Sequence, residues 1–191
     1  MAMLGVLLGG LFNLAAVEQA TPCSIDHPEA CRHANHLAGE PWFHQTVQHF
    51  LGKRRESYLY KSDLVSEQLL AVIGGPSEDV ERIGSYYRFT GCRYHSCTEK
   101  GAVVLGEGKL IALGILHSSC ALQPRSEYCF AEMTLTLYVR EPDQQQTVVA
   151  NLSAWAKLKV AEDYVGSGLS QARLVGIQVV TVTPKDAHRK S

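Results

Sequence analysis

The sequence Gly91-Cys92-Arg93-Tyr94-His95-Ser96-Cys97 sets a cysteine on either side of a central histidine. The residues before it, 86–90, and the apolar run after it, 102–105, favour a pleated backbone, so we expect a short loop between two strands. A disulfide between the two cysteines would close a ring of about six residues and contribute about 2 kcal/mol in the loop-entropy view. Such a ring fixes local shape and presents the side chains at its tip: Arg93, Tyr94, His95 and Ser96.

The N-terminal stretch, residues 1–16, is uncharged and rich in Leu, Gly and Ala. Its length is typical of a signal-peptide hydrophobic region and too short for a bilayer span. We therefore expect residues 1–20 to be a signal peptide and the mature protein to be periplasmic or secreted, with no membrane association. No Lys or Arg precedes the apolar run, and no clean small-x-small cleavage site follows it, so a buried N-terminal helix is the alternative.

The six cysteines also favour export, because an even number at close spacing is typical of an oxidising compartment. No Cys-x-x-Cys is present, so neither a redox pair nor a zinc ribbon is predicted. The simplest connectivity joins neighbours in the sequence: Cys23 with Cys31, Cys92 with Cys97, and Cys120 with Cys129.

The loop resembles the protruding loop of the inhibitor of vertebrate lysozyme (Ivy) family, bacterial periplasmic proteins that block the active site of c-type lysozymes. In that family the loop reads Cys-Lys-Pro-His-Asp-Cys, and its histidine reaches the two catalytic carboxylates of the enzyme. Here both cysteines, the basic residue and His95 match, whereas Tyr94 replaces the proline and Ser96 replaces the aspartate. The resemblance covers the loop closely and residues 83–116 loosely, and it implies that His95 is the central inhibitory residue.

Residues 24–55 look helical and are rich in histidine: His27, His33, His36, His44 and His49. A metal site is the functional alternative. However, the segment has no His-Glu-x-x-His pattern and no nearby cysteine pair free of bonding. We interpret these histidines as surface residues and expect neither a metal nor another cofactor.

Two helices have recognisable ends. Pro41 suits the first turn of one helix, and Gly52 ends it. Ser62 is the predicted N-cap of the next helix, which the sequence Gly74-Gly75-Pro76 ends. The acidic residues 77–82 are predicted to form a solvated turn, with attraction of a basic partner as the alternative.

The second half of the chain reads mainly as strands, the clearest being residues 132–139, where polar and apolar residues alternate. The other predicted elements are strands at 110–116 and 174–182, a turn at 106–108 and a helix at 152–160. Together they predict an α+β fold in which helices cover one side of an antiparallel sheet. The expected single domain spans residues 21–183, mainly helical over 21–75 and mainly sheet over 84–183, and residues 184–191 form a mobile tail.

The length of 191 residues and a hydrophobic content of 46% suit one well-packed domain, and the net charge of −1 gives no reason to expect nucleic acid. We expect a non-enzymatic protein whose partner is a c-type lysozyme or a related muralytic glycosidase. The sequence does not decide between a monomer and a homodimer. One alternative is an exported domain with another binding function. A second is a hydrolase using His95 with Ser96, or His117 with Ser118 or Ser119, although no Gly-x-Ser-x-Gly elbow is present.

Overall fold

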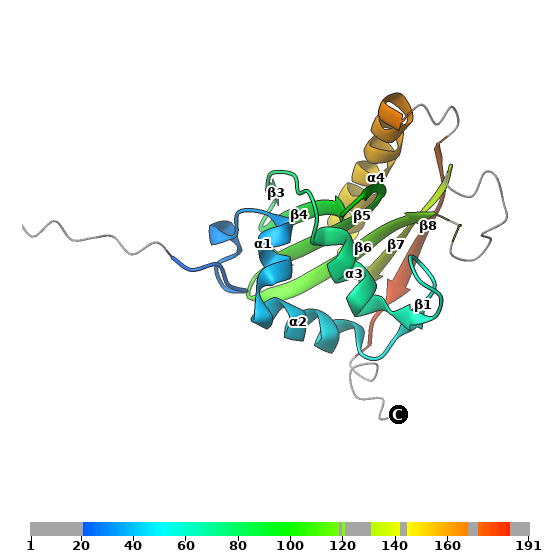
Figure 1. The fold of residues 1–191 in the computed structure, drawn as a ribbon. Helices are drawn as coiled ribbons and strands as arrows, with labels where there is room; N and C mark the ends of the chain where they lie inside the picture. The colour runs from blue at the N-terminus through cyan, green and yellow to red at the C-terminus, as the bar shows by residue number, and fades with distance from the viewer. Residues whose placement is uncertain (1–20, 119, 121–130, 142–144, 168–171, 184–191) are drawn as a thin grey trace, which may run out of the picture.

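The computed structural model describes residues 21–118, 120, 131–141, 145–167 and 172–183, which form a six-stranded sheet with helices on both faces (Figure 1). The first part of the chain contains a 3-10 helix at Pro28–Ala30, α1 (Ala34–Gly39), α2 (Pro41–Leu51), the short pair β1 (Arg55–Glu56) and β2 (Asp63–Leu64), and α3 (Val65–Ile73). The second part contains β3 (Glu81–Ile83), β4 (Tyr86–Arg93), β5 (Ser96–Gly106), β6 (Lys109–Ser118), β7 (Glu132–Val139), α4 (Gln146–Ser167) and β8 (Arg173–Thr181). The predicted α+β class is confirmed. The predicted signal peptide and C-terminal tail lie outside the described residues.

The strands lie in the order of the chain, β3-β4-β5-β6-β7-β8. Each pair from β3 to β7 is antiparallel, as predicted, but β8 runs parallel to β7. The reason is α4, whose 22 residues extend about 33 Å at ~1.5 Å per residue. That length carries the chain back along the sheet, so β8 starts beside the start of β7.

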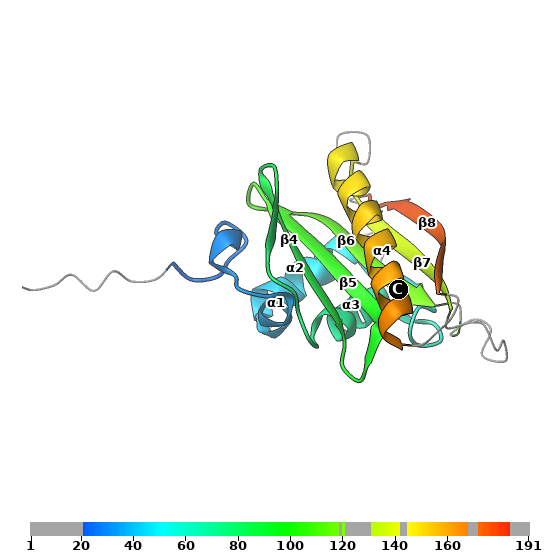
Figure 2. The same cartoon turned by 90° about the horizontal axis from the view of Figure 1, so that it is seen from above.

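Helices cover both faces of the sheet, whereas the sequence predicted one covered side. The first three helices pack on one face, over Phe89, Val103 and Leu113, and α4 packs on the other, over Val104 and Leu137 (Figure 2). The signal for two covered faces was present in β5, where residues 102–105 form an unbroken apolar run and are all buried. A strand with one solvated face would alternate polar and apolar residues instead.

The ends of α2 confirm the sequence prediction, and the start of α3 corrects it. Pro41 opens α2, and Gly52 follows its last residue with a positive φ of 62°. Ser62 does not cap α3, because its φ is 51° and its amide bonds to the Ser57 hydroxyl at 2.9 Å. Asp63 and Leu64 then pair with β1, so α3 begins only at Val65.

The acidic segment before β4 is not simply a solvated turn. Its last residues form the edge strand β3, and the Glu78 carboxylate bonds to Lys159 on α4 and accepts the Thr90 hydroxyl at 2.5 Å. Burial alone would raise the pKa of Glu78, but the hydrogen bonds from Lys159 and Thr90 outweigh it and lower the pKa. Glu78 therefore ties α4 to the sheet.

Candidate functional site

The loop at residues 91–97 is a β-hairpin with a two-residue turn. β4 ends at Arg93 and β5 begins at Ser96, which are paired, so Tyr94 and His95 form the turn itself. His95 has a φ of 63°, in the left-handed region that histidine, asparagine and aspartate enter more readily than most residues. The turn places these two side chains at the end of the hairpin.

The predicted disulfide between Cys92 and Cys97 is present, with a Cα–Cα distance of 4.8 Å. The strand register changes beside it, because Cys92 pairs with Lys100 whereas Arg93 pairs with Ser96. Residues 97–99 are therefore extra on the β5 side, as in a bulge, and Cys97 lies within bonding reach of Cys92. The ring restrains the hairpin tip.

Of the four residues predicted at the tip, Tyr94 and His95 are exposed to solvent. Tyr94 is 66% exposed, His95 is also exposed, and their rings meet edge to face with centroids 4.7 Å apart. The end of the β4–β5 hairpin projects past the neighbouring strands (Figure 2). Cys92 at its base is buried, whereas Cys97, its disulfide partner, is exposed.

Below the tip lies a carboxylate that the sequence analysis missed. Glu99 is only 6% exposed, accepts the Ser96 hydroxyl at 2.5 Å and lies 3.8 Å from the Arg93 guanidinium. Arg93 also lies over the Tyr60 ring, 5.8 Å from its centroid. Arg93 and Ser96 therefore have partners within the molecule, which leaves Tyr94 and His95 as the outward-facing pair.

The base of the hairpin is held by the segment that follows α3. The Cys92 amide donates to the Pro76 carbonyl at 2.9 Å, and Ser77 forms an isolated bridge with Gly91. Gly75 packs so closely that a Cβ there would lie 2.4 Å from the Cys92 carbonyl oxygen. On the other face, Lys100 donates to the Cys97 carbonyl and pairs with Asp163 of α4 at 3.0 Å. Both helical layers thus position the hairpin.

The other cysteine predictions have different outcomes. The Cys23–Cys31 disulfide is present, with a Cα–Cα distance of 4.6 Å. The predicted disulfide between Cys120 and Cys129 stays a prediction, because Cys129 lies outside the described residues.

Three of the five N-terminal histidines contact neighbours in their own segment. His27 lies 3.1 Å from the Glu29 carboxylate, His36 lies 3.4 Å from the Glu40 carboxylate, and His44 Nε2 lies 2.6 Å from the Ala38 carbonyl. In the described ranges, no group of three or more His, Cys, Asp and Glu side chains is placed to hold a metal ion.

His117, considered with serine in the hydrolase alternative, is buried on β6. Its Nε2 lies 3.1 Å from the Thr136 hydroxyl and its Nδ1 lies 3.3 Å from the Ser118 carbonyl oxygen, so both ring nitrogens face groups other than the Ser118 hydroxyl. Ser119 lies outside the described residues. The Tyr58 ring covers the imidazole at a centroid distance of 4.4 Å, and burial lowers the pKa of His117.

This buried imidazole predicts a loss of stability in mild acid. Because its pKa is lowered in the folded protein, His117 takes up a proton there only at a lower pH than in the unfolded chain, which is protonated near the ordinary pKa of 6.5. The free energy of unfolding should therefore fall as the pH drops below 6.5, by at most about 1.4 kcal/mol per pH unit for one proton. Urea unfolding of the parent and His117→Gln at pH 7.5 and pH 5 measures it, and equal pH dependence in both proteins would contradict the assignment.

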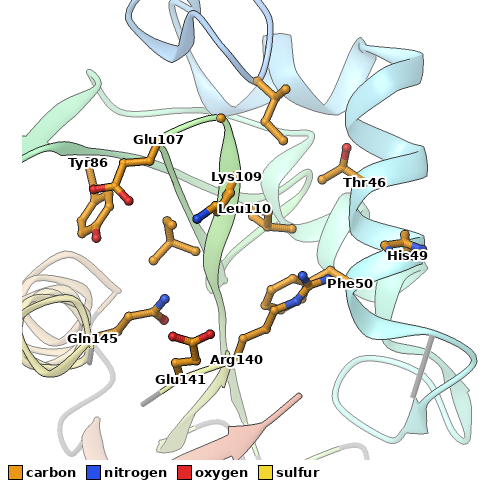
Figure 3. A pocket seen from close by; sticks show the side chains of 13 residues that line it. Thr46, His49, Phe50, Tyr86, Glu107, Lys109, Leu110, Arg140, Glu141 and Gln145 are labelled. Atoms are coloured by element: carbon orange, nitrogen blue, oxygen red, sulfur yellow. The ribbon is translucent and has the colours of Figure 1, made fainter. Parts of the chain in front are cut away.

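A separate cavity of about 470 Å³ lies at the far end of β5 from the hairpin tip (Figure 3). Its lining combines the buried side chains of Phe50 and Leu110 with exposed charges of both signs: Glu107, Lys109, Arg140 and Glu141. β5 has 11 residues, so its two ends lie about 30 Å apart at ~3.3 Å per residue. The cavity is therefore not part of the hairpin site.

Comparison of the chain with protein-family models, with curated proteins and with solved structures finds no match. No helix in the described part of the chain is long and apolar enough to cross a membrane.

Proposed function

We propose that this protein is an exported, non-enzymatic inhibitor of a c-type lysozyme or a related muralytic glycosidase, and that the β4–β5 hairpin enters the active-site cleft of that enzyme. The observation that carries the proposal is the disulfide-closed turn with exposed Tyr94 and His95 at its end. The resemblance of the loop sequence to the Ivy family supports the same assignment.

The chemistry of the target suits an imidazole. Such glycosidases cleave their substrate with two carboxyl groups on opposite sides of the scissile bond, one of them protonated to act as an acid. The imidazole of His95 has two ring nitrogens, so it can hydrogen-bond to a carboxylate and to a carboxylic acid together. Placed between the two groups, it would occupy the position of the substrate.

The construction of the hairpin supports tight binding. Because the disulfide, the Glu99 contacts and the packing of Gly75 already restrain the loop, little conformational freedom remains to be lost on docking. The replacement of the family's proline by Tyr94 makes this restraint depend more on the disulfide. Ser96, which replaces the aspartate, bonds inward to Glu99, so the proposed contact with the enzyme does not depend on it.

The experiment is a titration of the purified protein against c-type, g-type and i-type lysozymes in a cell-wall clearing assay. We expect stoichiometric inhibition of the c-type enzyme, lost when the disulfide is reduced, and little effect on the other two. Inhibition of another class alone would change the assigned target. The absence of inhibition in all three would reject the proposed function.

A further inference from the structure

A tyrosine distant in sequence from the hairpin lies beside it in space. Tyr60 belongs to the loop between β1 and β2 and is 48% exposed, with its ring centroid 5.8 Å from the Arg93 guanidinium carbon. Among the Phe, Tyr and Trp side chains whose exposure the structure describes, the exposed ones are Tyr60 and Tyr94. Tyr60 contacts Arg93 and Tyr94 follows Arg93 in the chain, so the exposed aromatic surface is concentrated around one arginine.

The backbone that carries Tyr60 is fixed from below by Gln68, a buried residue of α3. The Gln68 side-chain oxygen accepts the amides of Tyr58, Leu59 and Tyr60 at 3.1, 2.8 and 3.4 Å. Its side-chain nitrogen donates to the carbonyls of Glu56 and Asp63 at 2.9 and 3.0 Å. The Tyr60 ring therefore extends from an ordered loop, and docking need not first order that loop.

The chemical composition of this surface is that of an interface centre. Tyrosine and arginine are enriched among the residues that contribute most to protein–protein affinity, because each combines a large contact area with hydrogen-bonding groups. The Tyr60 hydroxyl forms no hydrogen bond within the described part of the chain, and the Arg93 charge is partly balanced by Glu99 at 3.8 Å. A partner can therefore cover this surface without having to neutralise an isolated cation.

We infer that Tyr60 is a second anchor for the glycosidase, an inference that rests on the proposed function. A glycosidase that cleaves polysaccharides binds several sugar rings in a row, and a tyrosine offers a flat apolar face with a hydroxyl at its edge, as a sugar ring does. With His95 between the catalytic carboxyl groups, Tyr60 contacts a neighbouring sugar-binding position of the cleft. The binding site therefore comprises the hairpin tip together with the β1–β2 loop.

The test compares Tyr60→Ala and Tyr60→Phe with the parent, using the dissociation constant for the lysozyme that the parent inhibits. The matched control is Leu158→Ala, which truncates another exposed apolar side chain, 56% exposed, on α4. We expect Tyr60→Ala to weaken binding about tenfold, mainly through faster dissociation, and Tyr60→Phe to weaken it less. Leu158→Ala should bind as the parent does, and the urea midpoints of all these proteins should agree.

The outcomes separate this inference from the proposed function. If Tyr60→Ala binds within about twofold of the parent while His95→Asn binds at least about tenfold more weakly, the second anchor is rejected and the inhibitor function stands. If Tyr60→Ala lowers the urea midpoint, the affinity of Tyr60→Gln, which retains a long side chain, is measured instead. Binding within about twofold of the parent then rejects the second anchor. If the parent inhibits no lysozyme, both assignments are rejected.

Discussion

The His95→Asn protein should bind its target lysozyme at least about tenfold more weakly than the parent, with a free energy of unfolding changed by no more than about 0.5 kcal/mol. His95 lies exposed at the end of the hairpin, so its replacement removes no core packing. Asparagine also tolerates the left-handed backbone at this position, where φ is 63°. By contrast, a charge-assisted contact at the centre of an interface contributes about 2 kcal/mol or more, and about 1.4 kcal/mol corresponds to a factor of ten in affinity.

The measurement pairs inhibition constants from the clearing assay with urea unfolding of the same proteins. His95→Ala should lose inhibition as His95→Asn does, because both lack the imidazole. Arg93→Ala should have a smaller effect, since the Arg93 guanidinium already faces Glu99 and Tyr60 within the molecule. If His95→Asn inhibits as strongly as the parent, the hairpin tip is not the inhibitory element.

The hairpin could be predicted from sequence because its determinants are local. The cysteines that close it, the strand-forming residues on either side and the turn residues all lie within one short stretch, and the structure pairs residues 87–93 with the strand 96–105 accordingly. The ends of α2 were predictable for the same reason, since proline and glycine act on the backbone at their own positions. Ser62 shows the limit of local rules, because the pairing of β2 with β1 delays the start of α3.

The parts that could not be predicted depend on contacts between distant segments. The parallel placement of β8 depends on the path of α4 across the second face of the sheet, which no local pattern specifies. Tyr60 and Gly75 belong to separate loops that the fold brings to the hairpin. The residues next to them in sequence do not predict this contact. Glu99 is close in sequence to the loop, but only the bulge at residues 97–99 turns its carboxylate toward Ser96.

The second large effect is expected for Gly75→Ala, which should destabilise the protein by about 2 kcal/mol and weaken inhibition together with it. A Cβ at this position would lie 2.4 Å from the Cys92 carbonyl oxygen and 2.8 Å from the Tyr94 amide nitrogen. Both are backbone atoms of the hairpin, so no side-chain rotation can relieve the contact. The hairpin would have to move away from α3, lengthening the 2.9 Å hydrogen bond from the Cys92 amide to Pro76.

Gly39→Ala is the matched control, because it adds the same methyl group at the end of α1, where a Cβ would meet nothing within 4 Å. Its urea midpoint and its inhibition should equal those of the parent. For Gly75→Ala, the amide resonances of residues 91–97 should shift the most. Its affinity for the lysozyme should also fall in buffer without urea, where the protein is folded. An unchanged urea midpoint for Gly75→Ala would show that the hairpin is not held against α3. A lower midpoint with full affinity would mean that the packing of Gly75 stabilises the fold without positioning His95.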